Sequence, residues 1–412
     1  MASFDTHDVK PALQRDLCYG STLPKPKGLP RLSHPQRLNG GPCAQGSSRI
    51  VRHVRRKSDG DGTASALWLS THQAGIAFNL LALLFLAHFI PRAQPYTTKF
   101  LTLAYYNSTS GNYGQGIDDV YLITFLVVLF TGLRVGTMDY VLAPFAEAWG
   151  VRKPKDLIRF TEQSWLLIYY VVFWTFGMYV YGTSKYWLNM EELWTNWPEV
   201  ELSGLTKVYM LAQWSFWLQQ ILVLKIEEPR KDYREMVTHH IVTISLIHAC
   251  YVYHQTRVGN LILVIMDFVD IILPVAKCLK YMGYKTVCDV VFGVLLVSWI
   301  ATRHVFYSLA CWSVYADIPR VIGESCWNRS SHVPEGPLPT PDSYTYMLKP
   351  FWDSHGLVCF NDRLKWAFLF PLLILQCLNF IWLAMIIRIA LRVLRREGAE
   401  DSRSDNEEDK EE

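Results

Sequence analysis

Eight long apolar runs constrain the fold of this 412-residue chain more than any other feature of its sequence. A helix needs about 20 residues to cross a bilayer core of ~30 Å, and each run supplies that length. The runs occupy residues 66–90, 118–136, 164–182, 205–226, 237–255, 260–281, 287–310 and 366–387. Since a bilayer offers the backbone no water to bond, such segments cross it as helices. The sequence therefore predicts an all-α polytopic membrane protein with about eight transmembrane helices.

The composition agrees with this class. Half of the residues are hydrophobic and 14% are aromatic, which favours a membrane protein over a soluble enzyme. The net charge of +3 indicates no particular partner, and we expect no nucleic acid. The N-terminus is polar and has no early apolar core, so we expect no cleavable signal peptide. The nine cysteines include no C-x-x-C pair, so we expect no metal site of that type.

The two ends of the chain are polar. Residues 1–65 are rich in Pro, Gly, Ser and Arg without periodic apolar residues, which is typical of a disordered arm. Residues 397–412 form an acidic tail. Ser402 and Ser404 each precede an acidic residue by three positions, the pattern that acidophilic kinases favour. The sequence thus offers two phosphorylation candidates, and a solvated tail that meets no kinase is the alternative.

Lysine and arginine are distributed unevenly between the loops. The arm 1–65 holds eleven of them, whereas loop 183–204 holds only Lys185. Because cytosolic segments carry the excess of Lys and Arg, both termini are predicted to be cytosolic. Two glycosylation sequons, at Asn107 and Asn328, fall in loops that the same rule places in the lumen. The agreement of two independent signals supports this orientation.

The largest loop is predicted over residues 311–364, on the lumenal side. It carries Cys311, Cys326 and Cys359. The lumen is oxidising, so two of the three are able to form a disulfide. The sequence alone leaves the pairing open.

Two adjacent histidines open the fifth apolar run, in "RKDYREMVTHHIVT". Polar groups inside a bilayer are costly and usually mark a functional site. On a helical wheel of about 100° per residue, Thr243 and Tyr251 lie near His240, while His239 lies at the edge of this polar stripe. A lone histidine is more often a satisfied core residue, but an adjacent pair beside a polar stripe indicates function. The geometry favours His240, and His239 remains the alternative.

The next apolar run carries two carboxylates, in "NLILVIMDFVDIILPVAKCLKY". Asp267 and Asp270 are three residues apart, so they share a helix face, and Asn260 falls near it. Two carboxylates in an apolar span are expensive unless something satisfies them. A structural pair neutralised by Lys277 or Arg303 is the alternative to a functional one. The loop before this helix, "QTRVG", is short, so we expect the histidine and aspartate stripes to face one another.

A basic loop precedes the histidines. It contains Arg230, Lys231 and Arg234, which are suited to bind phosphate groups at the cytosolic mouth of a site. Ordinary positive-inside charge explains the same residues. Both interpretations stay open from the sequence.

These stretches together resemble a known family. "RKDYREMVTHHIVT", "RVGNLILVIMDFVDIILPVAKCLKYMGY" and "SWIATRHVFY" are similar to the ceramide synthases of the TLC-domain family, over roughly residues 158–396. "FWLQQILVLKIEEPRKDY" fits as well, and the acidic tail resembles that of fungal members. The resemblance implies a TLC domain at 155–396, with six helices in a ring around a lipid cavity. It also implies two additional transmembrane helices in 66–150, and the endoplasmic reticulum membrane.

The resemblance further implies a reaction and a site. The family transfers a fatty acyl group from acyl-CoA to the amine of a sphingoid base. Its paired histidines and D-x-x-D motif match His239, His240, Asp267 and Asp270, the expected catalytic residues. The candidate substrate-binding residues are Arg230, Lys231, Arg234, Trp217, Asn260 and Arg303. Beyond acyl-CoA as co-substrate we expect no cofactor. Expected partners are membrane lipid, a second copy or a paralogue, or a small regulatory subunit.

Three other functional classes differ from an N-acyltransferase in the residues that they need. A di-iron lipid oxidase needs repeated H-x-x-x-H or H-x-x-H-H boxes, which the chain lacks. A proton-coupled transporter is expected to show inverted repeats, and none is apparent. A non-enzymatic TLC protein in lipid sensing or translocation lacks the paired His and Asp signature that this chain keeps. The sequence therefore favours an N-acyltransferase, with the non-enzymatic TLC protein as the alternative.

Overall fold

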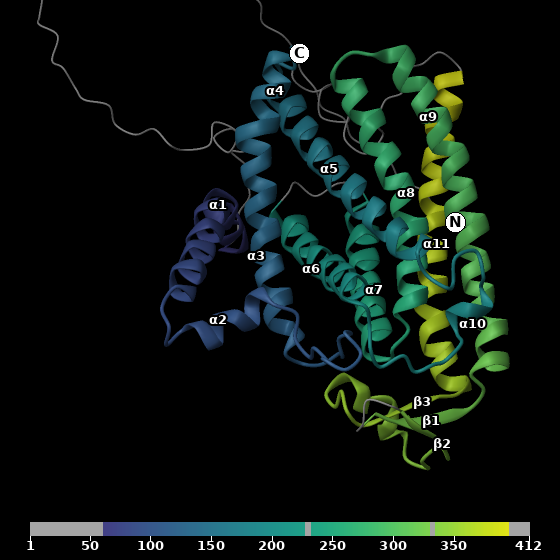
Figure 1. Cartoon of the computed structure of the whole chain (residues 1–412). Helices are drawn as coiled ribbons and strands as arrows, with labels where there is room; N and C mark the ends of the chain where they lie inside the picture. Colours follow the sequence, from purple (N-terminus) through teal and green to yellow (C-terminus); the bar gives the residue numbers. More distant parts are fainter. Residues whose placement is uncertain (1–60, 227–231, 330–333, 395–412) are drawn as a thin grey trace, which may run out of the picture. The chain divides into compact units, whose positions relative to one another are not determined.

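The structure, a computed structural model, describes residues 61–226, 232–329 and 334–394, which belong to one compact unit. Most of these residues are helical (Figure 1). The longer helices are α1 (Asp61–His88), α3 (Asp119–Thr137), α5 (Pro154–Gly182), α6 (Gly204–Ile226), α7 (Tyr233–Val252), α8 (Thr256–Tyr281), α9 (Lys285–Trp299), α10 (Tyr307–Val321) and α11 (Asp362–Leu394). The shorter ones are α2 (Gln94–Leu101) and α4 (Ala143–Ala148), with 3-10 turns at Glu191–Leu193, Tyr344–Met347 and Lys349–Phe351.

A helix covers most of every predicted apolar run. Within the described ranges, four segments are long and apolar enough to cross a membrane by length and composition. They are Asp119–Ala148, Pro154–Gly182, Lys285–Val321 and Asp362–Val393. The chain is therefore a multi-pass membrane protein. The crossing of all eight helices stays a prediction.

Two of these long segments contain a π-helical turn. Met138–Leu142 joins α3 to α4, and Ile300–Phe306 joins α9 to α10. A π turn inserts an extra residue into the helical ladder and is frequent at functional sites. The second turn carries Arg303, one of the candidate site residues.

Two predicted boundaries are wrong. The arm predicted over 1–65 extends too far, because α1 already begins at Asp61. The loop predicted over 311–364 begins too early, since α10 continues to Val321. Helix formation does not stop where the apolar run stops, because polar residues also occupy helix ends. The rest of the arm and the tail with Ser402 and Ser404 lie outside the described residues.

A small sheet corrects the all-helical prediction. Strands β1 (Ser325–Asn328), β2 (Glu335–Leu338) and β3 (Leu357–Phe360) form an antiparallel sheet in the order β2-β1-β3. It lies beyond the ends of α10 and α11 (Figure 1). These strands have four residues each, too few to show a periodic pattern in the sequence.

The sheet also settles the cysteine pairing. A disulfide joins Cys326 to Cys359, neighbours on β1 and β3. Cys311 is buried in α10 as a free thiol. The prediction that two of the three cysteines pair is confirmed, and the structure identifies the two.

Arg329 ties the sheet to the turn between α7 and α8. Its guanidinium donates to the carbonyls of Asp353 and Gly356, at 2.8 and 3.0 Å. It also donates to Nε2 of His254 at 2.8 Å, while Nδ1 of His254 donates to the Glu199 carbonyl at 3.1 Å. Burial, together with the Arg329 charge, lowers the pKa of His254 to about 3. The imidazole in this turn is therefore neutral.

Close helix contacts order the interior. Gly177 lets α5 approach α8, because a Cβ there would lie 2.6 Å from the Tyr209 hydroxyl and 2.8 Å from Val264. Helix α1 packs on α3, and α3 packs on α6. The additional N-terminal helices are thus joined to the later ones through α3.

A buried ion pair stabilises this junction. Lys207 on α6 is 0% exposed, and its Nζ lies 2.7 Å from Oδ1 of Asp119 on α3. The same ammonium donates to the carbonyls of Ala104 and Gly114. Tyr251 on α7 donates to the other Asp119 oxygen at 2.6 Å. These residues, called the Lys207 cluster below, connect α3, α6 and α7.

Candidate active site

An apolar cavity lies between α7, α8, α10 and α11. It encloses about 730 Å³ of empty space, counting the open space at its mouth. Its polar lining residues are His239, Thr243, Gln255, Asp267, Asp270 and Arg303. Its other lining residues are Trp217, Leu246, Ile247, Cys250, Val258, Gly259, Ile262, Leu263, Met266, Val314, Phe368, Leu372 and Leu375. A mostly apolar cavity with a few convergent polar groups is the usual form of a lipid or small-molecule site.

Helix α7 turns one of its two histidines toward the cavity. His239 lines it, followed at helical spacing by Thr243, Leu246 and Cys250. His240 is 4% exposed and is not among the lining residues. Its Nδ1 lies 2.7 Å from the Met236 carbonyl one turn back, which therefore accepts its proton. The sequence pattern favoured His240, whereas the cavity lies on the His239 side of α7, because adjacent residues diverge by about 100° on a helix.

Aromatic rings surround the His239 imidazole. Trp217 from α6 contacts both histidine rings edge-on, with centroids 5.2 Å away in each case. Trp382 from α11 contacts the His239 ring from another side, at 5.4 Å. Nδ1 of His239 is buried and has no hydrogen-bond partner in the described structure. The imidazole is thus positioned by packing, and its Nδ1 is left without a hydrogen-bond partner.

Helix α8 presents both carboxylates to the same cavity, as their spacing predicts. Asp270 pairs with Nη2 of Arg303 at 2.9 Å, and this nitrogen also donates to the Met266 carbonyl at 2.8 Å. Asp267 is 1% exposed and accepts from Nε2 of Gln213 at 2.9 Å. Its second oxygen, Oδ1, has no partner. Arg303 therefore neutralises only one of the two carboxylates.

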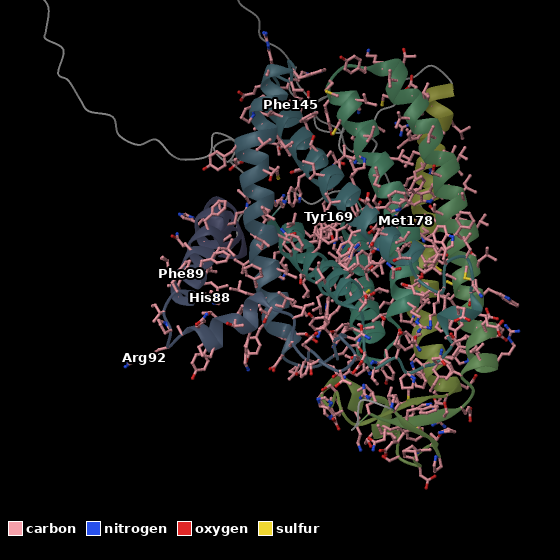
Figure 2. The ribbon with its side chains drawn as sticks, in the orientation of Figure 1. His88, Phe89, Arg92, Phe145, Tyr169 and Met178 are labelled. Atoms are coloured by element: carbon pink, nitrogen blue, oxygen red, sulfur yellow. A yellow bond between two sulfur atoms is a disulfide. The ribbon has the colours of Figure 1, made fainter. Side chains whose placement is uncertain are left out.

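A second row of residues holds Asp267 in place. Gln213 is fully buried on α6, and its Oε1 accepts from the Tyr169 hydroxyl at 3.0 Å. Tyr169 on α5 lies among the aromatic side chains of the interior (Figure 2). Neither residue was predicted from the sequence. In the sequence they are only a glutamine and a tyrosine inside apolar runs. Their link to Asp267 becomes evident only when the neighbouring helices are placed side by side.

The cavity continues away from the charged residues as an apolar channel. Asp270 of α8 and Gln255, just before α8, both line the cavity. They are fifteen positions apart, which corresponds to ~22 Å along the helix axis at 1.5 Å per residue. Between them the α8 lining is aliphatic apart from Asp267. The ionisable residues thus occupy one part of the cavity, and most of the remaining lining is apolar.

The other predicted substrate-binding residues have different places. Trp217 and Arg303 line the cavity, as described. Asn260 does not: it accepts from the Tyr186 hydroxyl at 3.1 Å and donates to the Gly177 carbonyl at 3.2 Å. It therefore connects α8 to α5, and its predicted contact with substrate has no support. Arg234 lies in the first turn of α7 and is exposed, and Arg230 and Lys231 lie outside the described residues.

Metal chemistry has no evident ligand set in this part of the chain. Over the described ranges, no group of three or more His, Cys, Asp or Glu side chains is arranged to hold a metal ion. The site instead combines an unpartnered imidazole, an unpartnered carboxylate oxygen and an Arg–Asp pair. These groups are suited to proton transfer, nucleophilic attack and charge stabilisation.

Comparison with known proteins identifies the family. The TLC-domain family model matches residues 159–388. Ceramide Synthase FUM18 of Gibberella moniliformis is 47% identical over 336 residues, which are 81% of this chain and 79% of that protein. Sphingosine N-acyltransferase-like protein ALT7 of Alternaria alternata is 44% identical, over 83% of this chain and 77% of its own. Sphingosine N-acyltransferase lag1 of Schizosaccharomyces pombe is 40% identical, over 85% of this chain and 84% of its own. The chain belongs to the TLC-domain family, and its relatives there include fungal ceramide synthases.

Proposed function

We propose that the protein is a ceramide synthase, which transfers a fatty acyl group from acyl-CoA to the amine of a sphingoid base. One observation carries the proposal: His239, Asp267 and Asp270 line the same, mostly apolar cavity. The identity to named ceramide synthases gives the substrates their chemical class. Acyl-CoA is the co-substrate, and the reaction needs no further cofactor.

His239 takes the central chemical role. In a direct route, its imidazole accepts a proton as the amine nitrogen attacks the thioester carbon, and the carbon–sulfur bond then breaks. In a two-step route, His239 itself attacks, CoA leaves as a thiolate that takes up a proton, and the amine displaces the imidazole. Each route forms one amide and releases one CoA thiol. The apolar cavity protects an acyl-imidazole from water.

The carboxylates support the imidazole. Asp267 keeps one free oxygen at the cavity, which favours the imidazolium formed during the reaction. Asp270 holds Arg303 in place through their ion pair. His240, bonded to its own helix, supports His239 from behind. Two faces of one helix thus supply one reacting and one supporting histidine.

The acyl chain lies along the apolar channel toward Gln255 in this proposal. Apart from Thr243 and Gln255, the channel is lined by apolar side chains of α7, α8 and α11, so it offers a hydrocarbon chain a largely apolar surface on which to be buried. The thioester is then at the level of His239. CoA remains at the open mouth, on the side where Arg234 is exposed.

The cellular arrangement extends the proposal. All eight long helical segments cross the membrane of the endoplasmic reticulum, both termini are cytosolic, and six helices of a TLC domain at 155–396 surround the cavity. Association with a second copy, a paralogue or a small regulatory subunit belongs to the same proposal. The supporting observations are the Lys and Arg distribution and the disulfide at the sheet end.

The two sequons lie at the end of the molecule proposed as lumenal. Asn107 donates from Nδ2 to Glu201 at 2.6 Å, and Asn328 is paired within β1. Of the two, Asn107 is in a loop and is the better acceptor site, since glycosylation favours surface loops. Protease digestion of sealed microsomes should remove tags from both termini, and Asn107→Gln should abolish a mobility shift. A protected tag would contradict the orientation.

The activity is tested with purified protein in lipid vesicles. Acyl-CoA and sphinganine are supplied, and ceramide is measured by mass spectrometry across a series of acyl lengths. The proposal predicts ceramide and free CoA in equal amounts. No ceramide at any length, from protein whose melting shows it to be folded, would favour the alternative of a non-enzymatic lipid-sensing or translocating TLC protein.

A further inference from the structure

Two N–H groups of α11 are buried near the site without a partner. Asn379 is 1% exposed, and neither Oδ1 nor Nδ2 has a hydrogen-bond partner. Trp382 is 7% exposed, and its Nε1 also lacks a partner. Buried polar groups are normally satisfied, so each exception needs an explanation. In a membrane-embedded helix the usual explanation is a role in function.

By helical position Asn379 lies on the cavity side of α11, just beyond the lining, since neither it nor Trp382 is among the lining residues. At about 100° per residue it falls between Leu372 and Leu375 on the helical wheel, and both of these line the cavity. It lies four residues beyond Leu375, or ~6 Å along the axis. In the same direction follows Trp382, whose ring contacts His239. Asn379 therefore lies between the last α11 residue of the cavity lining and the ring that touches His239.

A purely structural role fits these observations poorly. A structural amide would have partners, and Gln376 of the same helix has one: its Nε2 lies 3.0 Å from Nδ1 of His304, while its Oε1 has none. Asn379 instead sits among apolar neighbours, because Leu375, Leu378 and Trp382 belong to the same hydrophobic cluster. A leucine at this position would pack there without an unsatisfied amide. An unpaired buried carboxamide is thus costly in the free protein, and a bound ligand atom would satisfy it.

We propose that Nδ2 of Asn379, assisted by Nε1 of Trp382, binds the carbonyl oxygen of the acyl group and stabilises the oxyanion. The inference rests on the proposed function. When a nucleophile adds to the thioester carbon, the C=O electron pair moves onto the oxygen, and the two N–H groups donate to it. The pair then returns to re-form C=O as the carbon–sulfur bond breaks, and the CoA thiolate takes up the proton that the nucleophile released.

The chemistry suits a neutral donor. An amide N–H is fixed before the reaction and gains strength as charge develops on the oxygen in a dry site. It also avoids placing another full charge beside the Arg303–Asp270 pair. Because the donation strengthens in the transition state, its loss lowers kcat and leaves KM nearly unchanged.

The test compares Asn379→Leu, Trp382→Phe and, as matched control, Gln376→Leu, which removes an amide from the same helix. Purified variants are assayed with palmitoyl-CoA and sphinganine, and their melting temperatures are recorded. We expect Asn379→Leu to lower kcat by about 10²–10³-fold, with an unchanged KM for acyl-CoA and an equal or higher melting temperature. Trp382→Phe keeps the ring and should lower kcat less. The control should keep wild-type kcat.

Two results would overturn the inference. One is wild-type kcat in both Asn379→Leu and Trp382→Phe. The other is a raised KM with unchanged kcat in Asn379→Leu, which would assign Asn379 to substrate binding alone. If Asn379→Leu fails to fold, the kcat and KM of Trp382→Phe are used instead, and the same two results overturn the inference. An inactive wild-type protein would instead refute the proposed function, so the two failures are distinguishable.

Discussion

Two of the buried polar clusters among the described residues differ in how completely their atoms are paired. In the Lys207 cluster, the ammonium meets a carboxylate and two carbonyls, and the second carboxylate oxygen accepts from Tyr251. In the cavity, Nδ1 of His239 and Oδ1 of Asp267 have no partner. Burial is similar in both, since Lys207 is 0% and Asp267 is 1% exposed.

This difference in pairing distinguishes a structural cluster from a functional one. Buried charges are tolerated when they are paired and hydrogen-bonded. The Lys207 cluster meets that condition within the protein and joins three helices. The cavity cluster leaves donors and acceptors open, so it meets the condition only with a substrate. Mutations should therefore affect stability at the first cluster and turnover at the second.

The largest effect is expected at the open cluster. Asp267→Asn keeps the shape and an oxygen for Gln213 but removes the charge that favours an imidazolium. Ceramide turnover should fall by about 10²–10⁴-fold, while the melting temperature stays equal or rises, because a neutral amide costs less to bury than a carboxylate with an unpaired oxygen. Vesicle assays and melting curves of the same preparation measure both. A lower melting temperature with normal turnover would make Asp267 structural.

The paired cluster should respond in the opposite way. Lys207→Met leaves Asp119 buried without its counter-charge, which typically costs about 3–5 kcal/mol of stability. Turnover per folded molecule should remain near wild type. The double variant Lys207→Met, Asp119→Leu is the control and should recover part of the stability. Normal melting with greatly reduced turnover would remove the distinction between the clusters.

The sheet end offers a third comparison, because it is covalently held and far from the chemistry. Cys326→Ser with Cys359→Ser removes a disulfide that closes a separation of 33 residues. A loss of about 2–4 kcal/mol is expected from the freer unfolded chain. Melting with and without reductant should show it, and Cys311→Ser is the control. Equal melting of all variants would show that the sheet contributes little stability.

The smallest effect concerns pH. His254 lies in the turn after α7, with a pKa of about 3 against an ordinary 6.5. Its contribution is fully present above pH 6.5 and declines as pH falls toward 3, because only the unfolded chain takes up the proton. From pH 7.5 to 5 this amounts to about 2 kcal/mol. His254→Asn, tolerated at the positive φ of 57°, should lose less stability over that interval. An identical pH dependence in both proteins would contradict the neutral imidazole.

Much of the fold was predictable from the sequence, since the apolar runs specify where the helices lie. The sheet was not, because four-residue strands carry no clear period and their pairing depends on residues 33 positions apart. The helix ends were not predicted correctly either, because α10 continues through polar residues to Val321. Local pattern decides helix existence, while tertiary contacts decide where a helix stops.

The site was predicted in part for a similar reason. Spacing alone put Asp267 and Asp270 on one face, as found. It could not choose between His239 and His240, because the choice depends on where the neighbouring helices stand. Asn260 looked functional from its position but is bonded to α5. Asn379 was not predicted as a site residue, because a single polar residue in an apolar run becomes informative only when the structure shows that it lacks hydrogen-bond partners.

The central claim is that His239, which faces the cavity, carries the reaction, and His240 only supports it. The decisive measurement is ceramide turnover per folded molecule of His239→Ala beside His240→Ala. Loss of the reacting imidazole should reduce turnover by more than about 10³-fold, and loss of the supporting one by clearly less. If His239→Ala retains near wild-type turnover while His240→Ala is inactive, the assignment of the two histidines is reversed and the account fails.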